Sequence, residues 1–191
     1  MISYPYRFFQ IAGIVLLLSG CSPLGTQTGP PIASPPASAF LLEADVFPKG
    51  WVPSPEDEKG EIVAGRDFHL PTVAGHAYQE IHRRPNDWLA SEKYKVYLEG
   101  EINVRKFAPP PEITFHSKIA DEYYFACGVD RIPSCGMVAR YHNYFVFFYF
   151  DLFTKEQPEG LTYAEIEHVL EAFEAKVTDL FSVPAEATSV K

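Results

Sequence analysis

The chain has 191 residues and a formal net charge of −9 at pH 7, with 25 acidic against 16 basic side chains. A surface this acidic repels phosphate backbones, and nucleic-acid affinity comes largely from Lys and Arg that neutralise phosphates, so the composition argues against nucleic-acid binding. Apolar residues at 47% and charged residues at 21% are typical of a globular protein with one sizeable core.

The N-terminal stretch has the pattern of a targeting segment. Arg7 supplies a positive charge, residues 8–18 (FFQIAGIVLLL) form an apolar run, and the small residues Ser19 and Gly20 precede Cys21. A membrane-spanning helix needs about 20 apolar residues, so this run is too short to remain as an anchor. An uncleaved helix and a plain secretory signal are the alternatives, but a plain signal does not need a cysteine at the cleavage point.

The sequence Leu18-Ser19-Gly20-Cys21 resembles the lipobox of bacterial lipoprotein precursors. The resemblance implies that residues 1–20 are removed as a lipoprotein signal peptide and that Cys21 becomes the lipidated N-terminus. Two or more acyl chains, such as palmitate, hold a protein stably on a bilayer. We therefore expect the protein in the bacterial cell envelope, attached to the extracytoplasmic side of a membrane through the lipid on Cys21.

A tether and one domain are expected after the cysteine. Residues 21–38 contain five prolines and no charged side chain, so they cannot bury enough apolar surface to fold and favour an extended polyproline geometry. We expect a Pro/Ser-rich tether over 21–38, a globular domain over 39–183 and a disordered tail over 184–191.

The first part of the domain, residues 40–51 (FLLEADVFPKGW), predicts a short helical turn closed by a turn at Pro48 to Gly50. This opening is loosely similar to the start of other small bacterial lipoprotein domains, and that similarity implies no activity. The acidic run at 56–61 lacks the alternating carboxylates of a calcium loop, which favours a solvated loop.

Strands are predicted to dominate the middle of the domain. Alternation predicts a strand over 77–84 and a hairpin over 94–107, although residues 88–98 behind Asn86 as an N-cap could instead be helical. Short turns favour antiparallel pairing, since parallel strands need long crossovers. Beyond the proline run at 109–111, further strands are predicted at residues 113–116, 122–127, 136–142 and 144–153.

Cys127 and Cys135 form an even pair once Cys21 is assigned to lipid, in a compartment where disulfides persist. The segment between them, GVDRIPS, is rich in turn formers, so the pair is expected to staple a hairpin. A metal pair or a redox pair is the alternative. The spacing lacks the further ligands of a zinc site and the two-residue gap of a thioredoxin-like motif, so we predict a structural disulfide.

Residues 144–153 (YFVFFYFDLF) are apolar on both faces of a predicted strand, which is typical of a central strand covered on both sides. Thr162 and Glu165 form a capping box, and apolar residues at helical spacing predict a helix over 163–181 across one face. The sequence therefore predicts an α+β fold, with a single mostly antiparallel sheet and a long C-terminal helix packed on one face.

The second face of that strand is where the sequence bears most on function. Its cover is the region around Trp88, the segment 40–69, or something outside this chain. Ordinary core is one interpretation, and a groove for an apolar ligand or a partner is the other. We expect part of this face to be accessible. The possible ligand or partner face consists of Tyr123, Tyr141, Phe145, Phe147 and Tyr149, with the first two at its rim.

The sequence contains no nucleophile elbow, no zinc-protease helix motif and no phosphate-binding glycine loop. His76, Glu80 and His82 would point to one side of a strand, but they would span roughly 20 Å, which is too far for one ion. Only Glu80 and His82 could share a metal with help from elsewhere, and a solvated face is the favoured interpretation. We predict no catalytic residues, no metal and no cofactor.

These observations favour a membrane-anchored lipoprotein with a non-enzymatic binding or interaction domain, whose partner is a protein or an apolar small molecule. Such a domain needs only a rigid sheet, a soluble acidic surface and an exposed aromatic face. The alternative is an envelope hydrolase whose site is not visible in the sequence, because a hydrolase needs a convergent nucleophile, base and oxyanion donors.

Overall fold

A computed structural model describes residues 34–54, 58–71, 75–155 and 157–182 of the chain. The predicted signal peptide over 1–20, the lipidation site Cys21, most of the tether and the tail over 184–191 lie outside the described residues. Among the described residues, no helix is long and apolar enough to cross a membrane.

The described chain begins with two short 3-10 turns and then forms strands, a helix pair, three more strands and a final helix. Leu98–Asn103 is a π-helix that directly continues α1. In chain order the elements are η1 (Ala37–Phe40), η2 (Ala44–Val46), β1 (Val52–Pro53), β2 (Glu58–Lys59), β3 (Val63–His69), β4 (His76–Arg83), α1 (Asp87–Tyr97), η3 (Leu98–Asn103), β5 (Glu122–Val129), β6 (Pro133–Tyr141), β7 (Tyr144–Asp151) and α2 (Tyr163–Ser182).

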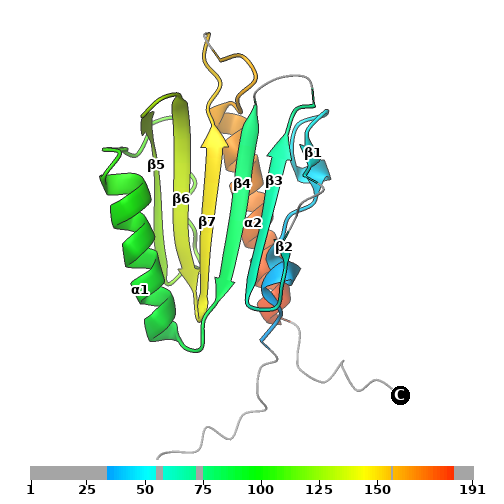
Figure 1. The fold of residues 1–191 in the computed structure, drawn as a ribbon, viewed down its shortest axis with the longest axis vertical. Coiled ribbons are helices and arrows are strands. Elements are labelled where there is room, and N and C mark those ends of the chain that lie inside the picture. Colours follow the sequence, from blue (N-terminus) through cyan, green and yellow to red (C-terminus); the bar gives the residue numbers. More distant parts are fainter. Residues whose placement is uncertain (1–33, 55–57, 72–74, 156, 183–191) are drawn as a thin grey trace, which may run out of the picture. The chain divides into compact units, whose positions relative to one another are not determined.

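The strands form one sheet in the order β1-β3-β4-β7-β6-β5, and β2 also pairs with β3 (Figure 1). The pairings between these strands are antiparallel. β7 lies at the centre, between β4 and β6, as its two apolar faces require. The predicted α+β fold, with one antiparallel sheet and a long C-terminal helix on one face, is confirmed.

The hairpin predicted over 94–107 is wrong, and the helical alternative is correct. α1 begins behind Asn86, whose side-chain Oδ1 accepts a hydrogen bond from the Leu89 N–H at 2.9 Å. This N-cap satisfies one of the free N–H groups of the first turn, and it outweighs the alternating apolar pattern of Tyr94, Val96 and Leu98.

Two other sequence predictions differ from the structure. Residues 113–116 are not a strand, because the N–H and hydroxyl of Thr114 both bond the Glu167 carboxylate of α2, at 3.1 and 2.9 Å. β3 was not predicted, because a glycine and a buried charge interrupt its alternation. That charge is Arg66, 5% exposed, which bonds the Leu42 carbonyl and pairs with Glu43 at 3.0 Å.

α2 closes one face of the sheet with the capping box that the sequence predicts. The Glu165 N–H donates to Thr162 Oγ1 at 3.3 Å, and the Thr162 N–H donates to Glu165 Oε2 at 2.8 Å. The core under α2 includes Ile166, Val169, Leu170, Phe173 and Val177 from the helix and Val146, Phe148 and Phe150 from β7.

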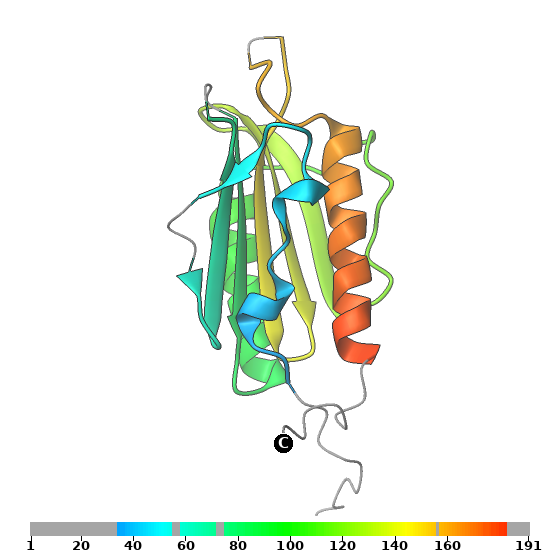
Figure 2. The same cartoon turned by 90° about the vertical axis from the view of Figure 1, so that its right-hand side faces the viewer.

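The N-terminal segment completes the α2 layer, running beside α2 along the same face (Figure 2). Gln79, fully buried on β4, fixes this segment. Its amide nitrogen donates to the Phe40 carbonyl at 3.0 Å, and its oxygen accepts from the Leu42 N–H at 2.9 Å. Because Phe40 and Leu42 are then fully packed, this face is a closed core.

The predicted disulfide between Cys127 and Cys135 is present in the structure. The two residues face each other directly in the β5–β6 register, so the bond crosses the hairpin close to the turn over 130–132.

Candidate functional site

The candidate site lies on the sheet face opposite α2, which α1 and η3 cover only in part. Tyr94 of α1 and Ile102 of η3 pack on Phe145, Phe147 and Val138 in a second, smaller core. On this same face, no helix of the described chain lies over β3 and β4 (Figure 1). Of the three possible covers that the sequence allowed for this face, the structure shows the region around Trp88. This region covers the face only in part.

The five residues predicted as one ligand or partner face lie on two opposite faces. Tyr123 and Tyr141 pack in the core under α2, where Tyr141 is 2% exposed and contacts Phe173 with ring centroids 5.9 Å apart. Phe145 and Phe147 are buried under α1, whereas Tyr149 is half-buried beyond the end of this cover. Of the five, Phe147 and Tyr149 line an open hollow on the face opposite α2, whereas Tyr123 lines a separate, smaller one beside Pro109 and Pro110.

One side of α1, η3 and the turn that follows presents four residues at intervals of four to this face: Lys93, Tyr97, Glu101 and Arg105. The Lys93 ammonium lies 4.5 Å from the centre of the Tyr97 ring, and Glu101 pairs with Arg105 at 2.7 Å. The last two of these residues reach the hollow only because η3 continues the helix past Tyr97. π-helical turns are rare in proteins, and those that occur often lie at functional sites. The π-helix η3 is therefore an independent indication that this segment belongs to a functional site.

A group of side-chain hydrogen bonds attaches α1 to the sheet; we call it the α1 fastening, and it joins Tyr97 of α1 to Glu80 and His82 of β4. The Tyr97 hydroxyl donates to both carboxylate oxygens of Glu80 at 3.0 Å, and His82 bonds the same carboxylate. Burial by itself raises the pKa of Glu80, but the bonds from His82 and Tyr97 and the charges of His82 and Lys93 together lower the pKa below its usual value. Glu80 and His82 do come together as the sequence suggested, but as part of this fastening.

Beyond the cover lie two adjoining hollows of about 550 and 500 Å³. We call them together the Tyr149 hollow, because Tyr149 and Arg105 line both. The first is lined by Arg105, Asp130, Arg131, Ile132, Ser134 and Tyr149. The second shares Arg105 and Tyr149 and adds Asp67, His76, Tyr78, Glu101 and Phe147.

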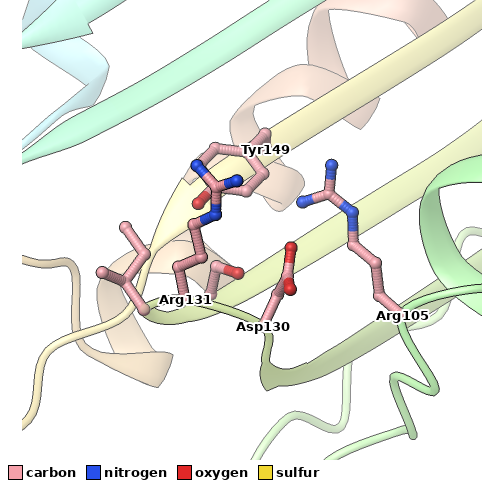
Figure 3. A pocket seen from close by; sticks show the side chains of 6 residues that line it. Arg105, Asp130, Arg131 and Tyr149 are labelled. Carbon is pink, nitrogen blue, oxygen red and sulfur yellow. The ribbon is translucent and has the colours of Figure 1, made fainter.

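Charged groups occur at both ends of the Tyr149 hollow. In the first part, Arg105 and Arg131 extend toward the same space, with the Asp130 carboxylate between them (Figure 3). In the second part, His76 Nε2 bonds Asp67 Oδ1 at 2.7 Å. The hollow thus offers guanidinium donors, an acid–base pair and an aromatic floor.

The aromatic floor of the hollow rests on two buried polar side chains, Ser134 and Asp151, which interact with the Tyr149 hydroxyl. Burial raises the pKa of Tyr149 even though its oxygen interacts with the Ser134 hydroxyl, so the phenol stays protonated. Burial also raises the pKa of Asp151, against the lowering effects of Tyr149 and His76. Asp151 is 2% exposed and its Oδ1 has no hydrogen-bond partner among the described residues. Tyr149 lines the hollow and can orient a polar ligand through its hydroxyl, whereas Asp151 does not line it.

The described residues contain no group of three or more His, Cys, Asp or Glu side chains arranged to hold a metal ion. His69 is the register partner of His76 at the end of β3, His142 lies in the turn between β6 and β7, and His116 packs on Tyr123 with ring centroids 5.0 Å apart.

Sequence reasoning missed most of the hollow, and in two places a signal existed. Asp130 was interpreted only as a turn former between the cysteines and Arg131 was given no role, although a disulfide beneath a turn fixes what the turn presents. Arg105 fell inside the wrongly predicted hairpin. The helical alternative, extended at intervals of four from Tyr97, would have placed Arg105 on the same side as Tyr97.

Comparisons with known protein families, with characterised proteins and with solved structures find no match to this chain.

Proposed function

We propose that this protein is a lipid-anchored component of the bacterial cell envelope whose domain works by non-enzymatic binding, with the Tyr149 hollow as the binding site. The observation that carries the proposal is the unequal cover of the sheet: one face is closed core, while the other leaves Tyr149 half-buried beside an open, polar hollow. A concave site with an aromatic floor and a few directed polar groups is the usual form of a ligand site.

The end of the sheet at which the tether joins the domain supports this proposal. The Ser34 carbonyl accepts a hydrogen bond from Arg83, at the end of β4, and the Pro35 carbonyl accepts one from Tyr144, at the start of β7. His76 and Asp151 lie at the opposite ends of these two strands. The tether therefore joins the domain at the far end of the sheet from the hollow, which leaves the hollow free to face away from the anchoring membrane.

The hydrolase alternative has weaker support. His76 with Asp67 could serve as an acid–base pair, but a hydrolase also needs a nucleophile within reach. Tyr149 carries a hydroxyl in the hollow and its ring centre lies 5.8 Å from that of His76, but its raised pKa makes it a poor nucleophile. Ser134 is 1% exposed and interacts with Tyr149.

The anchor is tested by the variant Cys21→Ala in the full-length precursor. We expect the protein to leave the membrane fraction or to remain as the unprocessed precursor, measured by fractionation and intact mass. A variant of mature size that stayed membrane-bound would contradict the lipid anchor.

The binding site is tested by native mass spectrometry of the mature protein extracted from its own host. We expect a co-purified mass on the wild type and its loss in Tyr149→Ala. Trp88→Ala is the matched control, because Trp88 is an aromatic residue 67% exposed on α1 and does not line the hollow. An equal co-purified mass on Tyr149→Ala, or none on the wild type, would count against the proposal.

A further inference from the structure

Two arginines from different parts of the chain converge on the Tyr149 hollow. Arg105 follows η3, and Arg131 lies in the turn between β5 and β6 (Figure 3). The chain as a whole has a net charge of −9, so two guanidinium groups in one hollow run against its overall charge. The Arg105 charge also reaches the floor, where it acts on the Tyr149 hydroxyl.

The same packing fixes the two segments that carry these arginines. The disulfide from Cys127 to Cys135 closes the hairpin beneath the turn. Cys127 also exchanges two backbone hydrogen bonds with Ala108, at 2.9 and 3.0 Å, three residues after Arg105. A side chain on Gly128 would meet the Phe107 ring at 2.5 Å, so glycine is what allows the segment after η3 to lie this close to β5. Both arginine backbones are therefore held before any ligand arrives, which lowers the entropy lost on binding.

The donors of Arg131 are free to take a ligand. Among the described residues, Arg131 and Asp130 make no hydrogen bond or ion pair, with each other or with any other group. Arg105 uses Nη2 for Glu101, at 2.7 Å, and has further N–H donors. A guanidinium presents its donors as a planar fork that matches two oxygens of a carboxylate or phosphate.

We propose that the Tyr149 hollow recognises an oxyanion, a carboxylate or phosphate group held by Arg105 and Arg131. This inference rests on the proposed binding function and names the chemistry of its ligand. The rest of the ligand extends over Tyr149 and Phe147 toward the pair of His76 and Asp67, where the hollow continues.

The proposal predicts opposite effects on anion binding for changes at Asp130 and at the two arginines. Its carboxylate lies between the two arginines, so it repels an incoming anion (Figure 3). Removing an arginine should therefore weaken anion binding, and neutralising Asp130 should strengthen it. A purely structural role for these three residues would not produce this reversal.

The test measures binding of inorganic phosphate and of acetate to the mature protein by isothermal titration calorimetry. Loss of a charge-assisted hydrogen bond predicts about tenfold weaker binding or more for Arg131→Gln and for Arg105→Gln. Asp130→Asn should bind several-fold more tightly. Lys118→Gln is the matched control, because it removes one exposed positive charge in a loop that bonds α2, on the other side of the sheet. It should bind as the wild type does.

Vesicles distinguish the two sources of the anion. If the oxyanion belongs to a lipid headgroup, the protein without its acyl anchor should sediment with phosphatidylcholine vesicles that contain phosphatidylglycerol, and Arg131→Gln should not. If it belongs to a soluble ligand, phosphate or acetate binds and the vesicles do not. We expect the soluble source, because the hollow lies at the far end of the sheet from the tether.

The outcomes separate this inference from the proposed function. No binding of phosphate, acetate or vesicles, or equal binding by Arg131→Gln and Lys118→Gln, would overturn the oxyanion site. If the mass that co-purifies from the host is lost in Tyr149→Ala but kept in Arg131→Gln, the hollow binds a ligand of another class and only this inference fails. If no co-purified mass depends on Tyr149, the proposed function fails with it.

Discussion

β7 has aromatic residues on both faces, yet the two faces differ in what covers them. Phe148 and Phe150 are fully buried under α2 and the N-terminal segment. On the other face, Phe145 is fully buried under α1, Phe147 is 7% exposed at the edge of this cover, and Tyr149 is half-buried beside the hollow. Burial of the aromatic residues on this face therefore decreases from Phe145 to Tyr149.

The lengths of the two helices explain the difference. α2 has 20 residues and is about 30 Å long, so it spans the roughly 26 Å of the 8-residue β7. α1 has 11 residues and is about 16 Å long. The chain continues it with η3, which brings charged residues to the place where more apolar cover would be needed. An aromatic strand face therefore predicts that another part of the protein covers it, but it does not predict that this cover is complete.

The largest expected effect comes from the closed face. Phe148→Ala should lower the free energy of unfolding by about 3–5 kcal/mol, because it leaves a cavity in a packed core. Tyr149→Ala should lower it by less than half as much, since solvent already reaches that side chain. Urea unfolding of the oxidised protein measures both. Equal losses would mean that the second face is as closed as the first and would remove the basis for a binding hollow.

The parts of the fold that the sequence predicts correctly are those in which local and long-range signals agree. The capping box at Thr162 and the apolar stripe behind it specify α2, and the two-sided apolar pattern of β7 specifies a central strand. α1 was ambiguous because apolar residues occur on its outer side as well: Val96 is 64% exposed, and Val104 beyond η3 is 73% exposed. An apolar pattern cannot separate a helix from a strand when outward positions are also apolar.

The hollow was harder to predict because its residues come together only through the sheet. Tyr78 and Tyr149 are register partners on β4 and β7, yet 71 positions separate them in the chain (149 minus 78). Arg105 and Arg131 reach the same hollow through the packing of Phe107 on Gly128, which no periodic pattern expresses. Tyr123 and Tyr141 were assigned to this face from their composition alone. The strand registers place both under α2 instead.

Removal of the disulfide should have the next largest effect on stability. It also tests how firmly the turn beside the hollow is held. The double variant Cys127→Ser with Cys135→Ser should lower the free energy of unfolding by about 2–3 kcal/mol, mainly because the unfolded chain regains freedom. The turn with Arg131 should also become more mobile, measured as faster amide hydrogen exchange over residues 128–134. Unchanged exchange there would show that packing alone holds the turn.

A smaller effect is expected from the fastening of α1 to the sheet. Glu80→Gln keeps the shape of the side chain but weakens its bonds with Tyr97 and His82, and it should lower the free energy of unfolding by about 1–2 kcal/mol. Lys95→Gln is the control, because Lys95 pairs with Glu92 on the solvent side of the same helix, and exposed pairs contribute little. Equal small losses for both variants would show that apolar packing alone holds α1.

The smallest effect concerns how stability depends on pH, because two carboxyl groups on the hollow face have pKa values shifted in opposite directions. The pKa of Glu80 is lowered from 4.5 in the folded protein, so its stabilising contribution is complete above pH 4.5 and is lost as the pH falls through the folded pKa. The pKa of Asp151 is raised from 3.8, so the folded protein holds this proton more tightly. Stability from Asp151 is therefore lost as the pH rises from 3.8 through the folded pKa.

Urea unfolding between pH 3 and pH 7 should show these two trends as differences from matched variants. The stability of the wild type minus that of Glu80→Gln should increase with rising pH. The stability of the wild type minus that of Asp151→Asn should decrease, because the asparagine stays neutral where the buried carboxylate becomes charged. The other carboxyl groups titrate in all three proteins, so their contribution cancels in each difference. Two differences with the same slope would contradict a face on which Glu80 is held ionised by its partners while Asp151 is held neutral by burial.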